Sequence, residues 1–431
     1  MKKNLSFLIL LFYLAARPAP GFGASEPVPA SPVELASYLA LAYERNPEIS
    51  AAHARWQAAK KSVLAAWALK DPMIGMDIMG ADRETANGPE MNRFVVEQEI
   101  PFPLKLWKRR AAARAMEKAE RERYFAVRRV VANKLRNAWY ELNGVDESLK
   151  GIDEIKAVLE KFQKVAQARY ANRSGSQRDV AKAQAEVALA LEQELMLRQR
   201  REALAAALNA LVDRDPLETI PAFAVPEKPQ VHQEFRELLA KATERRAELL
   251  AVEAEVHKSL EERALAWMEN LPDLKAGFEY TWVESPMNGG MADKPGQDQW
   301  MFPLRINVPL WQNRIIPEIQ AAHQRTAEAK AEAGVVRNQI FYELREAFVR
   351  FDTSRQVVLL YETAVLPQAR LALASDDAGY ESGGVMFLDL LDSERTYLNA
   401  RLAYARLYSE MMRAYADLEL AAGTELEGGK P

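Results

Sequence analysis

The sequence predicts a mainly helical protein with a small β part, in which one structural unit occurs twice. Long proline-free stretches carry apolar residues at helical spacing, short segments alternate apolar and polar residues, and several motifs recur in order in both halves. The chain has 431 residues, 49% of them hydrophobic and 27% charged, which excludes a disordered chain. The formal net charge of -4, with basic residues spread along the helices, indicates no nucleic-acid partner.

The first 23 residues have the pattern of a secretory signal peptide. Lys2 and Lys3 precede an apolar run from Leu5 to Leu14, and small residues follow up to Gly23. This run is too short to cross a bilayer as a helix. We therefore expect cleavage near Gly23 and an exported mature chain; a retained membrane anchor is the alternative.

The chain contains no cysteine, which excludes disulfides, thiolate metal sites, a cysteine nucleophile and a lipid anchor on cysteine. Outside residues 1–23 no uninterrupted apolar run reaches about 18 residues, so we expect no transmembrane helix. Contact with a membrane would then require strands or a surface helix.

The two halves repeat one another. ERNPEI at Glu44 matches ERRAEL at Glu244, and the helices that follow end before Pro72 and Pro272. Further matched pairs are EIPFP with NVPLW, LRNAW with LREAF, and YANRSGSQRD with YESGGVMFLD. We predict a first repeat over residues 24–215, a Pro-rich linker over 216–231 and a second repeat over 232–431.

The elements of the first repeat follow from their patterns. A helix over about 47–70 leads to strands over about 73–80 and 93–100. Residues 104–170 contain no proline and predict one helix, roughly 100 Å long if continuous, which must pack against neighbouring helices. Its apolar stripe consists of Tyr124, Val127, Val131, Leu135, Ala138 and Leu142. A turn over 171–179 precedes a helix that ends near residue 212.

The second repeat has the same order of elements. We expect strands over about 273–282 and 299–308 and a long helix over about 311–380. A turn over 381–384 precedes a last helix that ends near residue 421. The windows between the paired strands are rich in glycine, proline and asparagine, which indicates hairpin loops.

The strand over 299–308 has one fully apolar face. Strands of about ten residues are long enough to cross a bilayer at a tilt, so we expect this face to contact lipid and Arg305 and Asn307 to face a lumen. Pro303 opposes a regular strand because it lacks a backbone donor. A soluble β clasp packed on the helices is the alternative. The apolar face consists of Trp300, Phe302, Leu304, Ile306 and Val308.

Four strands cannot close a barrel with a lumen, because even about eight strands leave room only for side chains. Lipid also excludes an open sheet edge. The strands must therefore come from several copies of the chain, and three copies supply a twelve-stranded barrel. We expect a homotrimer.

The combined pattern resembles the TolC-like outer-membrane efflux proteins of Gram-negative bacteria. ERNPEI, EQEIPFP, the duplicated helix–hairpin–helix plan and YESGGVMFLDLLDSE carry the resemblance, and QEIPFPLK is closest to the heavy-metal-efflux branch. The resemblance implies a trimer with a twelve-strand β-barrel in the outer membrane and a long α-helical barrel in the periplasm.

As partners the resemblance implies outer-membrane lipid, a periplasmic adapter (membrane fusion) protein and an inner-membrane pump of the resistance-nodulation-division type. The channel would passively conduct small solutes such as drugs, metal ions or other toxic compounds. A soluble periplasmic coiled-coil adapter or scaffold is the rival hypothesis.

The resemblance also implies functional residues. Asp389 and Asp392 match the acidic gate; they share a helix face, and a trimer would gather six carboxylates that attract cations. A solvated helix face beside a turn is the alternative. Tyr380 and Asp179 match a helix latch, although the latch arginine of the family falls near Val385. The turns that would contact the adapter contain Ser174, Gly175, Ser176, Gly383 and Gly384.

No pattern in the sequence indicates catalysis, a metal site or a cofactor. No nucleotide-binding or hydrolase motif occurs, so we expect no enzyme. Met73, Met76 and Met79 are either soft metal ligands or strand packing. The histidines are too far apart in sequence for a metal motif: His53, His232, His257 and His323.

Overall fold

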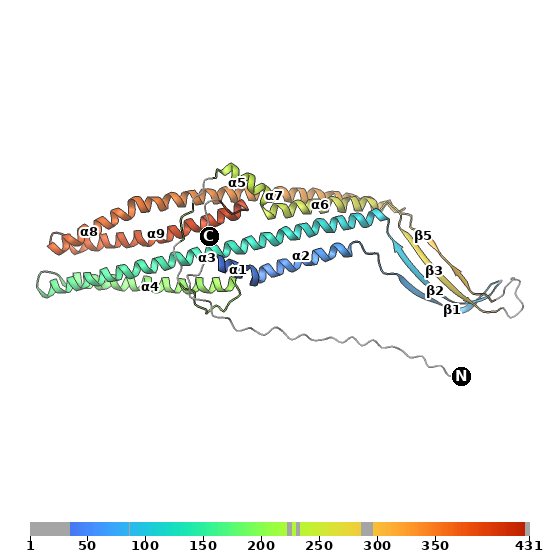
Figure 1. The fold of residues 1–431 in the computed structure, drawn as a ribbon, viewed down its shortest axis with the longest axis horizontal. Coiled ribbons are helices and arrows are strands. Elements are labelled where there is room, and N and C mark those ends of the chain that lie inside the picture. The colour runs from blue at the N-terminus through green and yellow to red at the C-terminus, as the bar shows by residue number, and fades with distance from the viewer. Residues whose placement is uncertain (1–34, 86, 222–225, 230–232, 286–295, 427–431) are drawn as a thin grey trace, which may run out of the picture.

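The computed structural model describes residues 35–85, 87–221, 226–229, 233–285 and 296–426. The predicted signal peptide lies outside these residues, as do parts of the predicted linker and of the second hairpin loop. The molecule is elongated: helices run alongside one another over most of its length, and a small sheet projects at one end (Figure 1).

Both halves contain two short helices, a hairpin region, a very long helix and a closing helix, so the predicted mainly helical, duplicated fold is confirmed. The first half consists of α1 (Leu35–Arg45), α2 (Pro47–Ala65), β1 (Met73–Thr85), β2 (Gly88–Ile100), α3 (Pro103–Ala171) and α4 (Gln177–Leu211). The second consists of α5 (Phe235–Arg245), α6 (Ala247–Met268), β3 (Leu274–Val283), β4 (Gln299–Met301), β5 (Leu304–Ile306), α7 (Gln312–Leu360), the π-helical turn η1 (Tyr361–Val365), α8 (Leu366–Ser382) and α9 (Phe387–Ala422).

The repeated ERN and ERR motifs have the same structural role. Asn46, between α1 and α2, is buried, and its Nδ2 donates to the carbonyl of Leu211 at 2.9 Å. Arg246, between α5 and α6, is also buried, and its Nη1 donates to the carbonyls of Leu420 and Ala421 at 3.3 and 3.2 Å. In each half the motif therefore donates hydrogen bonds to carbonyls at the end of the closing helix, where the regular helical hydrogen bonds stop.

The helices pack through two apolar clusters. One lies at the waist of the molecule, the region around α1 and α5, and the other lies toward the tips, the turns between α3 and α4 and between α8 and α9. Within the first cluster α3 and α9 approach closely at Gly144. A Cβ atom there would lie 2.6 Å from Cβ of Ser409, whose hydroxyl donates to the carbonyl of Tyr140 at 2.8 Å. Only glycine permits this helix spacing.

The two hairpins form one antiparallel sheet of order β1-β2-β3-β4, with β5 also paired to β3. β2 and β3 join the halves in the centre, where Val96 is opposite Phe278. β1 lies on one edge and β4 and β5 lie on the other.

The first hairpin is longer than predicted. β1 and β2 each have 13 residues rather than ending at the expected loop. Pairing resumes beyond a register shift between Ile78 and Arg83 and continues to Thr85 opposite Gly88. The irregularity interrupts the period-2 pattern, so the sequence suggested a loop where the strands continue.

The predicted last strand over 299–308 is wrong as a single element. The structure divides it into β4 and β5 around Phe302 and Pro303. Pro303 has no N–H to donate, although its carbonyl accepts from the Gly277 amide at 2.9 Å.

Among the described residues, one continuous helical stretch, Gln312–Ser382, contains an 18-residue window that is long and apolar enough to cross a membrane, and 11% of that window is buried. This window meets the criterion by length and composition only, so the absence of a transmembrane helix stays a prediction. This stretch packs along α6 and α9 in the helical body.

Candidate functional site

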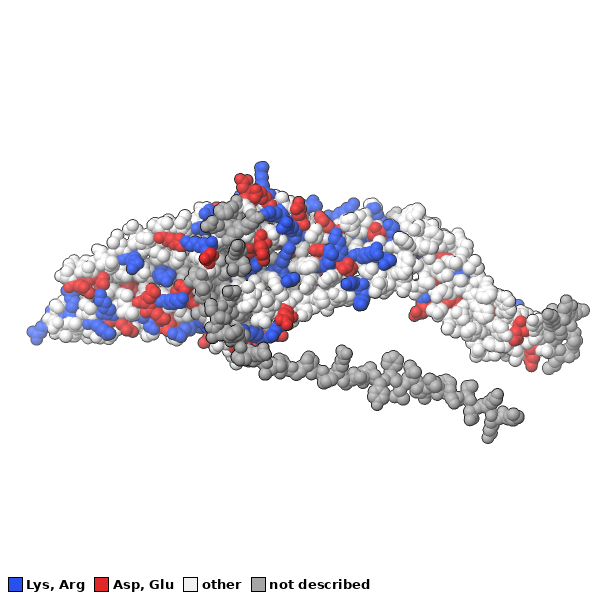
Figure 2. All heavy atoms as spheres, in the orientation of Figure 1, with Lys and Arg blue, Asp and Glu red and all other residues white. Residues whose placement is uncertain are grey.

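The sheet exposes apolar side chains on one face. On the side of the molecule shown in Figure 2, charged residues are spread over the helical body, whereas most of the sheet is uncharged. The Trp300 and Phe302 rings lie 5.5 Å apart, and Phe302 also contacts the Phe278 ring at 5.3 Å. The exposed fractions are 64% for Trp300, 70% for Phe302, 70% for Leu304, 63% for Ile306 and 62% for Val308. Contact of this face with lipid stays a prediction.

Strand β1 continues this apolar surface in a way that the sequence reasoning missed. Ile74, Met76 and Ile78 alternate along β1 and are 68%, 54% and 78% exposed. Met73, Met76 and Met79 recur at every third residue in the sequence, which hides the alternation through the isoleucines. It is the period-2 signal of a sheet face.

The opposite face of the sheet carries an ion-pair network. Glu279 is buried, lies 3.5 Å from the Arg93 guanidinium and accepts a hydrogen bond from Arg305 at 2.7 Å. Arg305 also pairs with Glu97. Asn307 is not part of this network, because its side-chain oxygen accepts from the backbone amide of Asp273.

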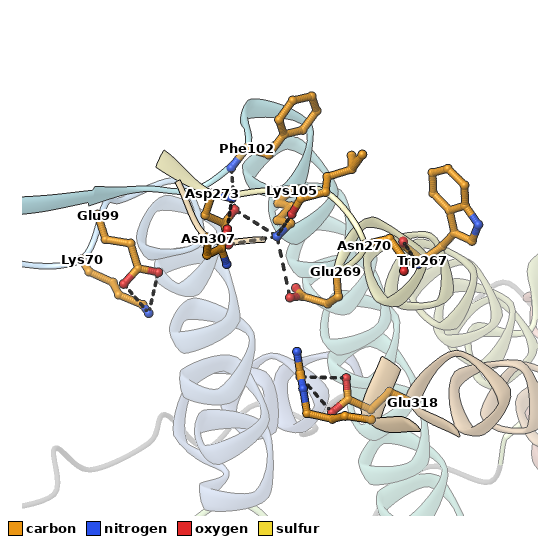
Figure 3. Close-up of polar contacts among 12 residues, drawn as sticks. Lys70, Glu99, Phe102, Lys105, Trp267, Glu269, Asn270, Asp273, Asn307 and Glu318 are labelled. Atoms are coloured by element: carbon orange, nitrogen blue, oxygen red, sulfur yellow. Dashed lines mark hydrogen bonds and ion pairs between the residues drawn. The ribbon is translucent and has the colours of Figure 1, made fainter. Parts of the chain in front are cut away.

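A buried lysine joins the sheet to the helices (Figure 3). Lys105, near the start of α3, is 1% exposed, and its ammonium lies 2.9 Å from the Asp273 carboxylate and 3.0 Å from the Leu271 carbonyl. The same carboxylate accepts from the backbone amide of Phe102 at 2.8 Å. The sequence reasoning missed Lys105, since nothing in the helical periodicity separates it from the exposed lysines of α3.

The two tips lie at the end opposite the sheet (Figure 1). The Ser176 hydroxyl caps α4 by accepting from the Asp179 amide at 3.2 Å, and the Asp179 carboxylate accepts from the Ser176 amide at 3.3 Å. The hydroxyl of Ser174 donates to the Arg169 carbonyl at 3.2 Å. Gly383 ends α8 with a φ of 85°, in the left-handed region that glycine tolerates. Both tips are therefore short turns built from capping residues.

The structure does not bring the predicted latch residues together within one chain. Asp179 belongs to the cap of α4, whereas Tyr380 contacts Arg169. The Arg169 guanidinium lies 4.6 Å from the centre of the Tyr380 ring and donates to the Tyr380 carbonyl at 2.8 Å. Lys161 adds ion pairs to Asp377 at 3.1 Å and Glu381 at 3.0 Å. Arg169 and Lys161, which the sequence reasoning missed, tie α3 to α8.

The predicted gate residues lie in the first turns of α9. Asp389 and Asp392 are exposed, whereas Leu390 and Leu391 between them are buried in the core. Neither aspartate has an ion pair or side-chain hydrogen bond within the described part of the chain. Their charges are thus available to cations or to other copies of the chain.

Possible metal ligands do not cluster in the described residues: no group of three or more His, Asp or Glu side chains is arranged to hold an ion. His53 instead contacts the rings of Trp56 and Tyr124 at 5.7 and 5.6 Å.

Solved structures of outer-membrane channels have the same fold. The outer membrane protein VceC from Vibrio cholerae matches with a TM-score of 0.75 and 19% identity over 91% of this chain and 97% of its own. The CmeC channel of Campylobacter jejuni matches with a TM-score of 0.75 and 18% identity over 92% of this chain and 87% of its own. The open state of the MtrE channel of Neisseria gonorrhoeae matches with a TM-score of 0.73 and 17% identity over 90% of this chain and 89% of its own. No curated protein matches this chain.

The family model described as outer membrane efflux protein matches twice, over residues 38–213 and 238–424, which together make up most of the chain. The family is one of channel proteins rather than enzymes. The structural neighbours are outer-membrane channels of Gram-negative bacteria with a large helical part in the periplasm. The chain belongs to the outer membrane efflux protein family and is a channel component of a tripartite efflux system.

Proposed function

We propose that three copies of this chain form one channel that conducts small solutes, such as drugs, metal ions or other toxic compounds, out of the cell. The main support for this proposal is the unpaired edges of the sheet. β1 and the β4–β5 pair each have a neighbour on one side only among the described strands, and lipid excludes such open edges. Three sheets joined edge to edge would close a twelve-stranded barrel.

The two faces of the sheet support this orientation. The apolar face with Trp300, Phe302, Leu304, Ile306 and Val308 would contact outer-membrane lipid. The face with Glu279 and Arg305 would line the lumen, where water solvates charged groups.

The tips would contact a periplasmic adapter protein, which joins the channel to an inner-membrane pump of the resistance-nodulation-division type. Small residues at Ser174, Gly175, Ser176, Gly383 and Gly384 leave room for a partner helix to approach closely. Asp389 and Asp392 would form the gate above the tips, and Tyr380 and Asp179 would hold neighbouring helices in the closed state.

The oligomeric state tests the proposal. Protein purified in detergent should contain three chains per particle by light scattering corrected for bound detergent. The same particle should conduct ions in a planar bilayer. A stable monomer that stays in solution without detergent would refute the barrel.

A further inference from the structure

We propose that a pocket at the waist of the molecule binds an oxyanion, namely a phosphate or carboxylate group, through Arg128, Arg129, Arg136 and Arg245. The pocket has a volume of about 460 Å³ and lies between α3, the end of α5 and the C-terminal end of α9. This volume lies within the range of small-ligand sites, which is about 300 to 1,000 Å³. The proposal is independent of the channel function.

The pocket has an excess of positive charge. Arg136 is paired with Glu419 at 2.9 Å and Glu425 at 3.5 Å. Arg128, Arg129 and Arg245 have no carboxylate within 4.0 Å among the residues that the structure describes. Glu419 and Glu425 are the carboxylates that line the pocket, and both pair with Arg136, so the lining has two more arginines than carboxylates and three arginines without a carboxylate partner.

Neutral contacts hold these three guanidinium groups in place. Arg128 lies over the Tyr43 ring at 4.0 Å from its centre. Arg129 donates to the Arg245 carbonyl at 2.9 Å, and Arg245 donates to the Thr424 hydroxyl at 3.3 Å. A guanidinium has five N–H donors, so each group retains donors for a ligand. Because the side chains are already ordered, binding would cost little additional conformational entropy.

Guanidinium chemistry selects the ligand class. The planar fork of arginine donates two parallel hydrogen bonds to a carboxylate or phosphate group. Several such forks around one pocket favour an anion with more than one negative oxygen. A bound anion would connect Tyr43 of α1, the arginines of α3 and Arg245 of α5 to the end of α9. It would thereby stabilise the waist.

Calorimetric titration of the detergent-purified protein, whatever its oligomeric state, tests the site. The probes are pyrophosphate, inorganic phosphate and succinate, at equal ionic strength in a buffer without phosphate. We expect saturable binding of one anion per chain. The Arg128→Gln/Arg245→Gln variant should bind about ten-fold more weakly or worse, since a hydrogen bond to a charged group contributes about 1.5 kcal/mol or more. Arg325→Gln, which removes an exposed arginine of α7, should bind like the wild type.

The relative affinities of the probes distinguish the two ligand classes. Tighter binding of pyrophosphate assigns the site to phosphate groups, and tighter binding of succinate assigns it to carboxylates. If the double variant does not fold, Arg128→Lys keeps the charge but loses the fork, and it should also bind more weakly. No saturable binding to the wild type, or equal binding to a folded variant, overturns the proposal.

Discussion

Glu394 is a buried carboxylic acid of the helical body and lines a pocket with Glu186 and Arg395. It is 1% exposed, lies on the α9 stripe that includes Leu390 and Leu398, and neither oxygen has a hydrogen-bond partner within the described residues. Burial raises its pKa to about 7, and the negative charge of Glu186 on α4 adds to this rise, whereas Arg395 opposes it. Glu186 is itself paired with Arg395. At neutral pH the core therefore contains a group close to its titration midpoint.

The sign of the resulting pH dependence follows from this shift. The folded protein binds the proton more tightly than the unfolded chain, where the pKa has its ordinary value of 4.5. Stability should therefore be highest below pH 4.5 for this group and should decrease as the pH rises to about 7. Glu394→Leu should abolish this dependence and melt at a higher temperature than the wild type at alkaline pH. Thermal melts across the pH range test this, with Glu192→Leu, at an exposed position of α4, as the control. Parallel curves for wild type and Glu394→Leu would exclude the assignment.

Asp389 and Asp392 give a second prediction at the scale of residues. If six carboxylates surround the entrance, the trimer should conduct cations selectively and should be blocked by divalent cations added on the periplasmic side. Asp389→Ala/Asp392→Ala should lose the block and much of the selectivity in planar-bilayer recordings. Glu332→Ala, on α7 and distant in sequence from the tips, is the control. If block and selectivity are unchanged in the double variant, the two aspartates do not form the gate and are only part of a solvated helix face.

At the scale of elements, the two faces of the sheet should tolerate charge differently. Leu304 of β5 belongs to the apolar face, whereas Met301 of β4 lies opposite Glu279 in the register and shares the polar face. An arginine in the middle of the lipid face costs roughly 2 to 4 kcal/mol. We expect Leu304→Arg to reduce trimer yield in the outer membrane and Met301→Arg to be tolerated. Asn307 is a less suitable control because it accepts a hydrogen bond from Asp273. Equal yields would show that the faces are assigned wrongly.

The crossing of α3 and α9 gives a matched pair of glycine substitutions. A Cβ at Gly144 would lie 2.6 Å from Ser409 Cβ, whereas a Cβ at Gly334 of α7 meets nothing within 4 Å. Gly334→Ala should stabilise its helix by up to about 1 kcal/mol, because alanine has the higher helix propensity. Gly144→Ala should destabilise the protein by about 1 to 3 kcal/mol through overpacking. Thermal melts of the two variants should thus shift in opposite directions; a shared direction would mean that α3 and α9 adjust their spacing freely.

At the scale of the whole molecule, the order of the elements was more predictable than the contacts between individual residues. Periodicity over tens of residues gave the helix of α3, and repetition of motifs gave the two halves, since both signals accumulate along the chain. Pro303 indicated an irregular strand, but the sequence alone did not show that pairing to β3 resumes after this residue.

Contacts between distant residues carried no such signal. Arg169 and Tyr380 meet because two helix ends lie side by side, and Lys105 is buried because Asp273 belongs to a loop 168 positions later. A lysine or arginine on a helix has the same local pattern whether it is solvated or paired. The roles of Asp389 and Asp392 depend on other copies of the chain, so a single chain leaves them as predictions.

The different caps of the two halves have a consequence for the assembled channel. Asn46 caps α4 with a neutral amide, whereas Arg246 caps α9 with a charge that also pairs with Glu248 and Glu343. In the proposed trimer, neutral and ionic caps would therefore alternate around the waist. The six repeats of the trimer would have similar shapes, but only three of them would carry ionic caps. Salt and acid weaken ion pairs and leave amide caps unchanged, so only these three would respond. High salt or low pH would therefore weaken the contacts of Arg246 with α9 in each chain, whereas the contacts of Asn46 with α4 would persist.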